Sequence, residues 1–93
     1  MDDTIEKRLQ DAVAGLQAAG AREVYLFGSY VEGRARPDSD IDLAVSGLPP
    51  EKFYRAFHDV MQTLHCPLDL VDLDEDNLFT QHLKTSGELV RVG

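Results

Sequence analysis

Positive charge is scarce in this chain of 93 residues, which has 9 Lys and Arg against 17 Asp and Glu. The net charge of -8 argues against a protein that binds nucleic acid by itself, because such a protein needs a basic face for the phosphate backbone. Any bound polyphosphate must be held by metal ions and local hydrogen-bond donors, since the overall field repels an anion.

Cysteine, long apolar runs and internal repeats are also scarce or absent. Cys66 is the single cysteine, which excludes an internal disulfide and is typical of a reducing compartment. No apolar run approaches the roughly 20 residues that a membrane-spanning helix needs, and the acidic, polar N-terminus is unlike a secretory signal peptide. We therefore expect a cytoplasmic protein without membrane contact, built as a single domain over residues 1–93.

Apolar periodicity predicts alternating helices and strands. Gly20 and Gly87 are expected to end the first and last helices, and Asp76 or Asn77 to cap the last one, which carries Leu78, Phe79 and Leu83. The expected order is helix 5–16, strand 24–27, strand 40–45, helix 53–64, strand 68–73, helix 78–83 and strand 88–92. This order predicts an α/β fold, a small mixed β-sheet with helices packed on one face, and leaves the other face for function.

Two aspartates, Asp40 and Asp42, lie at positions i and i+2 of the second predicted strand. Residues at this spacing point to the same face of a strand, and two adjacent carboxylates repel each other unless a cation lies between them. Mg2+ prefers such oxygen ligands and completes its shell with water and phosphates. An acidic, solvent-exposed strand face is the alternative, but the neighbouring glycine-serine turn favours a metal site.

That turn, Gly28-Ser29, follows directly on the first predicted strand. Its backbone N–H groups and the Ser29 hydroxyl can donate to a phosphate, and Gly28 allows close approach of the backbone. An ordinary turn is the alternative, because Gly-Ser is common in turns. Together with the carboxylates, however, the pair predicts a site for a nucleoside triphosphate with its Mg2+.

A third carboxylate is expected on the strand that begins at Leu68. Strand alternation points Asp69 to the face opposite to the core-facing Leu68 and Leu70, whereas Asp72 points to the same face as these leucines. Alternation therefore selects Asp69, unless a bulge before Asp72 reverses the parity.

These residues resemble a known family. Gly28-Ser29, then Ser39-Asp40-Ile41-Asp42-Leu43, then Leu68-Asp69-Leu70-Val71, are similar to the minimal nucleotidyltransferases of the DNA polymerase beta superfamily, over almost the whole chain. The resemblance implies a polymerase-beta-like palm in which Asp40, Asp42 and Asp69 bind two divalent metal ions, and Gly28 and Ser29 contact phosphate. It also implies transfer of a nucleoside monophosphate, and a HEPT-domain toxin as partner.

The chain differs from the family in one respect. Many members have a basic residue directly after the glycine-serine pair, whereas this chain has Tyr30 and Val31. Arg34 and Arg36, in the same loop, are candidates to contact the triphosphate instead; solvated loop cations are the alternative.

The expected function is thus Mg2+-dependent transfer of AMP from ATP to a hydroxyl of a partner protein, as the antitoxin of a HEPT-type toxin. Two alternatives remain open. The chain could neutralise its partner by binding alone, or it could modify a small-molecule hydroxyl, which the absence of an acceptor-binding domain disfavours. No nucleic acid is expected as a partner.

Overall fold

Three helices and four strands make up the described part of the chain, which comprises residues 3–28, 31, 33, 40–64 and 67–93 of a computed structural model. In chain order they are α1 (Asp3–Ala19), β1 (Glu23–Phe27), β2 (Ile41–Ser46), α3 (Pro50–Leu64), β3 (Leu68–Asp72), α4 (Leu78–Ser86) and β4 (Val90–Arg91). The predicted α/β architecture is confirmed, and the last strand is shorter than the predicted 88–92.

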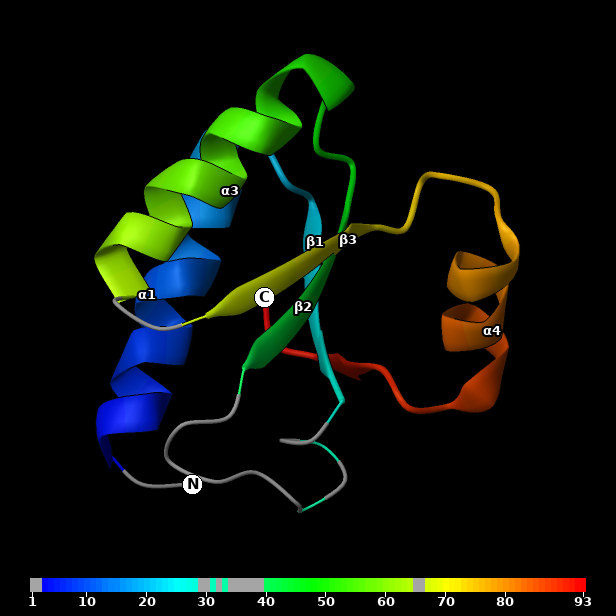
Figure 1. Cartoon of the computed structure of the whole chain (residues 1–93), viewed down its shortest axis with the longest axis horizontal. Helices are drawn as coiled ribbons and strands as arrows, with labels where there is room; N and C mark the ends of the chain where they lie inside the picture. The colour runs from blue at the N-terminus through cyan, green and yellow to red at the C-terminus, as the bar shows by residue number, and fades with distance from the viewer. Residues whose placement is uncertain (1–2, 29–30, 32, 34–39, 65–66) are drawn as a thin grey trace.

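The four strands form one mixed sheet in the order β3-β2-β1-β4 (Figure 1). β1 is antiparallel to both β2 and β4, whereas β2 and β3 are parallel. Parallel neighbours need a long crossover, and α3 supplies it. As a result β2 and β3 begin at the same end of the sheet, and β1 ends there too.

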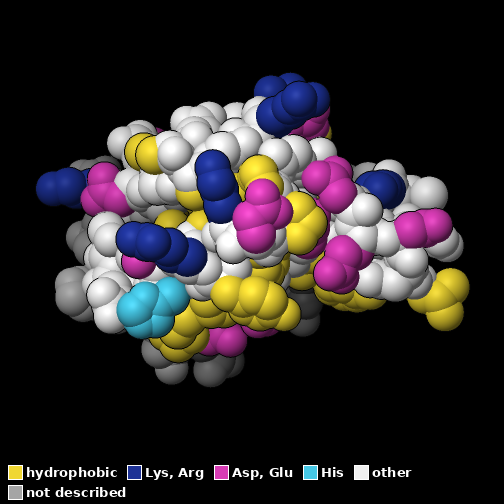
Figure 2. Space-filling model, turned by 90° about the horizontal axis from the view of Figure 1, so that it is seen from above, with side chains coloured by type: hydrophobic (Ala, Val, Ile, Leu, Met, Phe, Trp, Pro, Cys, Tyr) yellow, Lys and Arg dark blue, Asp and Glu magenta, His cyan; other side chains and the backbone are white. Residues whose placement is uncertain are grey.

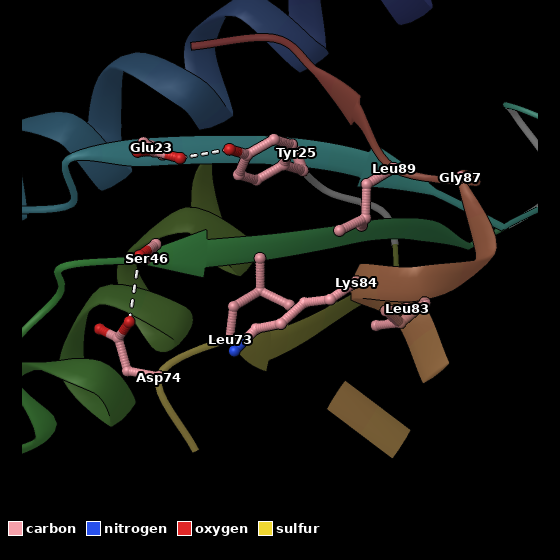
Figure 3. Close-up of a pocket in the computed structure, with 9 residues that line it drawn as sticks. All are labelled: Glu23, Tyr25, Ser46, Leu73, Asp74, Leu83, Lys84, Gly87 and Leu89. Atoms are coloured by element: carbon pink, nitrogen blue, oxygen red, sulfur yellow. Dashed lines mark hydrogen bonds between the residues drawn. The ribbon is translucent and has the colours of Figure 1, made fainter. Parts of the chain in front are cut away.

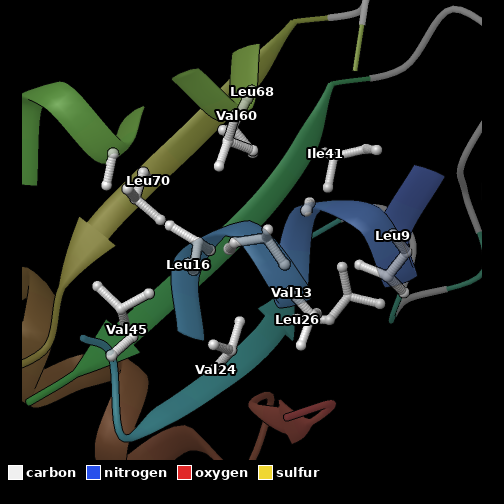
Figure 4. Packing of buried hydrophobic residues seen from close by; sticks show 14 of the residues in the cluster. Leu9, Val13, Leu16, Val24, Leu26, Ile41, Val45, Val60, Leu68 and Leu70 are labelled. Carbon is white, nitrogen blue, oxygen red and sulfur yellow. The ribbon is translucent and has the colours of Figure 1, made fainter. Parts of the chain in front are cut away.

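The main core lies between the sheet and the helices α1 and α3, which pack side by side on one face (Figure 1). Alternate residues of the strands point into it, as the predicted one-sided alternation requires. Figure 4 shows how the two helices and three strands meet there. Its largest fully buried side chains are Leu16, Val24, Ile41, Leu43, Val45, Leu48 and Leu64.

The third helix, α4, lies on the other side of the sheet (Figure 1). Its Leu83 is buried in a second, smaller cluster with Phe27, Ala44 and Leu73. The face that we expected to be free for function is therefore partly covered. Of the apolar residues predicted for this helix, Leu83 is buried, whereas Leu78 and Phe79 are 85% and 52% exposed.

The capping residues of α4 are well defined. The Asn77 side chain accepts a hydrogen bond from the Thr80 backbone N–H at 2.9 Å, and the Thr80 hydroxyl accepts one from the Asn77 backbone N–H at 3.2 Å. This capping box selects Asn77 from the two predicted caps. Gly87 ends the helix in the left-handed conformation, as predicted.

Charged side chains of both signs are interspersed over the surface seen from above (Figure 2). The loop between β3 and α4 contributes the exposed acids Asp74, Glu75 and Asp76, whereas α3 carries the exposed bases Lys52 and Arg55. In the part of the chain that the structure describes, no helix is both long enough and apolar enough to span a bilayer.

Candidate active site

Asp42 and Asp69 lie side by side on neighbouring strands. The parallel register of β2 and β3 pairs Asp42 with Asp69, and the next pairs follow without interruption to Val45 and Asp72. There is no bulge that could exchange the roles of Asp69 and Asp72. Asp42 shares a sheet face with Ala44, which is two residues further and packs in the cluster below α4. Both paired carboxylates therefore lie on the face opposite to the main core.

Asp40 comes immediately before β2 and is exposed. It is two residues before Asp42, so the extended chain places it at the beginning of the strand near the other two carboxylates. Asp69 is also exposed, on β3 at an edge of the sheet. All three predicted aspartates thus belong to the end of the sheet at which β2 and β3 begin.

Gly28 lies directly against Asp42. β1 ends at Phe27, which pairs with Asp42 in the antiparallel register, so the following turn passes over the beginning of β2. A Cβ atom on Gly28 would lie 2.1 Å from Asp42 Oδ2 and 2.9 Å from Asp42 Cγ, and its φ of +77° favours glycine. The sequence suggested close approach of a phosphate as the reason for this glycine; the structure adds the close approach of a carboxylate.

The donor set fits Mg2+, although the described residues contain no group of three or more His, Cys, Asp and Glu side chains that converge on a single point. Mg2+ is commonly held by one or two carboxylates, with water and substrate phosphates as its other ligands. The register-paired carboxylates of Asp42 and Asp69 supply oxygen ligands of this kind. A closed cage of protein ligands is not needed for a metal ion that arrives with a nucleotide.

Three further predicted site residues, Ser29, Arg34 and Arg36, lie outside the described residues. Their predicted contacts with phosphate remain predictions. The flanking residues Gly28 and Asp40 are described, and they bring both ends of the intervening segment to the same end of the sheet as Asp42.

A separate hollow of about 350 Å³ lies on the α4 side of the sheet (Figure 3). Its lining combines strand residues with residues of α4 and the loops around it: Glu23, Tyr25, Ser46, Leu73, Asp74, Leu83, Lys84, Gly87 and Leu89. Ser46 is four residues beyond Asp42 on β2, so this part of the hollow is roughly 13 Å from the carboxylates. The hollow is thus distinct from the candidate active site.

Two polar contacts shape the hollow. The Ser46 hydroxyl donates to Asp74 at 3.0 Å, and the Tyr25 hydroxyl donates to the Glu23 carboxylate (Figure 3). The hydrogen bond to Glu23 raises the pKa of Tyr25 above its usual value; burial and the negative charge of Glu23 act in the same direction, and Arg91 opposes them. Tyr25 lies in the strand expected over residues 24–27, but the expectation of a strand did not include this contact. The period-two relation of Glu23 and Tyr25 is the signal that could have indicated it.

Residues 16–91 match the polymerase beta nucleotidyltransferase family. The chain belongs to this family. The matched segment includes β1, β2 and β3, and hence Gly28 and all three predicted aspartates. The predicted family and its fold are therefore confirmed.

Solved structures agree with the family. A protein assigned as a minimal nucleotidyltransferase is 25% identical, with a TM-score of 0.76 over 99% of this chain and 97% of its own. A toxin-antitoxin structure with AMP-PNP is 26% identical, with a TM-score of 0.61 over 96% of this chain and 69% of its own.

A third structure, of a tri-AMPylated HEPN toxin with its MNT antitoxin from Shewanella oneidensis, is 21% identical. It has a TM-score of 0.67 over 92% of this chain and 69% of its own, and at this identity it supports the fold alone. No curated protein shows significant similarity to the chain.

Proposed function

We propose that this nucleotidyltransferase transfers AMP from ATP, in a Mg2+-dependent reaction, to a hydroxyl group of a HEPT-type partner protein and thereby acts as its antitoxin. The observation that carries the proposal is the pairing of Asp42 with Asp69 in register, with Gly28 against Asp42. Two carboxylates on adjacent strands repel each other, and a bound cation removes that repulsion.

The proposed roles follow from the position of each residue. Asp40, Asp42 and Asp69 would hold Mg2+, while Gly28 and Ser29 would contact the triphosphate. Bound Mg2+ neutralises phosphate charge and makes a coordinated hydroxyl more acidic. Arg34 or Arg36 would add positive charge near the leaving pyrophosphate.

The transfer itself needs one bond to form and one to break. The acceptor oxygen forms a bond to the α-phosphorus while the bond from the α-phosphorus to the bridging oxygen of the β-phosphate breaks, so pyrophosphate leaves. The acceptor hydroxyl loses its proton, and Asp69 orients this hydroxyl and takes up the proton. Asp69 is exposed on the edge strand β3, so a separate protein could bring its hydroxyl close to this carboxylate.

The partner and the nucleotide are supported by the related structures. The toxin-antitoxin structure at 26% identity contains AMP-PNP, a non-hydrolysable analogue of ATP. The structure from Shewanella oneidensis contains a HEPN toxin that carries three AMP modifications together with an MNT antitoxin. We therefore take ATP as the proposed donor and a hydroxyl of a HEPT-type toxin as the proposed acceptor.

The test is to incubate the purified chain with ATP, Mg2+ and a purified HEPT-type protein from the same genome, and to record intact masses of both proteins. We expect the partner to gain the mass of one or more AMP units, which peptide mapping would assign to a tyrosine, serine or threonine. Asp42→Asn should abolish the gain, and Asp72→Asn should retain it. If the partner stays unmodified but is fully inhibited by the Asp42→Asn protein, neutralisation occurs by binding and the enzymatic proposal is wrong.

A further inference from the structure

An exposed aromatic ring lies beside the candidate active site. Phe79 is 52% exposed at the beginning of α4, and its ring contacts that of Phe27 with centroids 6.3 Å apart and an interplanar angle of 66°. Phe27 is itself only 9% exposed. The contact is therefore edge-to-face, a stable arrangement for two aromatic rings, and about half of the Phe79 side chain remains open to solvent.

Phe27 connects this ring with the carboxylates. It is the register partner of Asp42 on the neighbouring strand, and directly paired residues of antiparallel strands project from the same face with Cβ atoms about 5 Å apart. Phe27 also packs in the cluster that contains Ala44, which shares that face with Asp42. Phe79 thus stands over the face that carries Asp42 and Asp69, next to the end of the sheet at which they lie.

We propose that Phe79 is the stacking surface for the nucleobase of the bound nucleotide. This inference rests on the proposed function, because it requires that the triphosphate lie between Gly28 and the carboxylates. The base would then extend from the phosphates toward α4 and place its flat face on the exposed part of the Phe79 ring. Every base has such a face, so stacking adds affinity without strict selection of the base.

The first experiment compares a nucleotide with a ligand that lacks the base. Equilibrium binding is measured for Mg2+-ATP and for Mg2+-tripolyphosphate, with wild type, Phe79→Ala and Leu78→Ala. Phe79→Ala should weaken ATP binding about 5- to 150-fold, the range of a lost base–aromatic stack, and leave tripolyphosphate binding unchanged. Leu78→Ala removes the adjacent, more exposed apolar side chain of the same helix. It should change neither the affinity for ATP nor the affinity for tripolyphosphate.

Two further variants separate stacking from packing. Phe79→Leu keeps an apolar contact with Phe27 but has no aromatic face, so it should behave like Phe79→Ala toward ATP. The chain contains no tryptophan, so Phe79→Trp introduces a unique fluorophore. Its emission should be quenched by Mg2+-ATP and not by Mg2+-tripolyphosphate, since only ATP carries a base that can stack on it.

The outcomes distinguish the two proposals. If Phe79→Ala or Phe79→Leu binds ATP as tightly as wild type, the stacking role is wrong while the nucleotide site stands. If Phe79→Ala weakens the binding of ATP and of tripolyphosphate by the same factor, the ring of Phe79 only maintains the structure of the site, and the stacking role is again wrong. If wild type binds neither ligand with Mg2+, the proposed function fails, and the inference fails with it.

Discussion

Gly28 occupies a position where a side chain would collide with a carboxylate. An alanine there would place its Cβ atom 2.1 Å from Asp42 Oδ2, in a backbone conformation with φ of +77°. Gly87 has almost the same φ, +75°, but no atom lies within 4 Å of the position of its Cβ. An alanine would therefore strain the backbone equally at both positions, but only at Gly28 would it also collide with Asp42.

We predict that Gly28→Ala abolishes Mg2+-dependent binding of ATP, because the Asp42 carboxylate must turn away from the added methyl group. Gly87→Ala should keep this binding. Each variant should lose about 1–2 kcal/mol of stability through the left-handed backbone conformation. Isothermal titration and urea unfolding of both proteins would check this. Intact ATP binding by Gly28→Ala would show that the orientation of Asp42 does not matter.

Tyr25 is a second residue whose chemistry depends on one neighbour. Its hydrogen bond to Glu23 raises the pKa of the phenol above 10.0, its ordinary value. Because the folded pKa is higher than the unfolded one, the folded state holds this proton more tightly. The resulting stability is fully present below pH 10 and is lost as the pH rises through the folded pKa.

We therefore predict that wild type loses stability above pH 10 more steeply than Tyr25→Phe, which has no ionisable group at this position. Glu23→Ala removes both the acceptor and the charge, so it should bring the pKa of Tyr25 down toward its ordinary value. Ultraviolet titration of the phenolates, with the Tyr25→Phe spectrum subtracted, measures that pKa. An unchanged pKa in Glu23→Ala would contradict the assigned cause.

At the scale of the elements, the pairing of β2 with β3 decides which carboxylates meet. Asp69 lies opposite Asp42, whereas Asp72 lies opposite the buried Val45. Asp72 Oδ1 instead accepts a hydrogen bond of 2.9 Å from the Asp74 backbone N–H, which shapes the loop after β3. Asp72 thus takes part in the loop after β3, whereas Asp69 lies beside Asp42.

We predict that Asp69→Asn lowers turnover at least about a hundredfold, the scale expected for loss of a group that positions or transfers a proton. Its stability should be unchanged or slightly higher, because one of two paired negative charges is removed. Asp72→Asn retains an amide oxygen that can accept from Asp74, so it should keep both fold and activity. Turnover of the two variants at saturating Mg2+ and ATP decides the matter, and the reverse pattern would overturn the assignment.

Across the whole molecule, the net charge of -8 opposes the approach of a triphosphate. Acidic side chains are spread over the surface seen from above (Figure 2), and the candidate site itself contains Asp40, Asp42 and Asp69. Local hydrogen-bond donors act over short distances, whereas the charge of the molecule acts over about 10 Å at ordinary salt. We therefore expect that a nucleotide binds strongly only together with divalent cations.

We predict that ATP raises the melting temperature only when Mg2+ is present. Ligand at a hundred times its Kd should stabilise the fold by about 2.7 kcal/mol, and a domain of this size gains roughly 4–8 °C for each kcal/mol. Thermal scans with ATP and Mg2+, with ATP and EDTA, and with the Asp42→Asn variant form the test. A shift of equal size in EDTA would contradict binding through the metal.

Local patterns in the sequence determined the helices, the strands and the face of each residue. Helical spacing, alternation and glycine stops depend on neighbours in the chain, so α1, α3 and the three main strands lie close to their predicted ranges. The same alternation puts Asp69 and Asp72 on opposite faces of their strand. What a pattern of this kind cannot specify is which strands pair and in which register.

Only the tertiary structure decided that β2 and β3 run parallel and that Gly28 packs against Asp42. It also decided that α4 covers part of the sheet face that carries Asp42 and brings Phe79 to Phe27. Each of these facts joins residues that are far apart in the chain, and each depends on how whole elements pack rather than on local preference. The sequence determined which residues could form a site, and the packing of the sheet and of α4 decided where they meet.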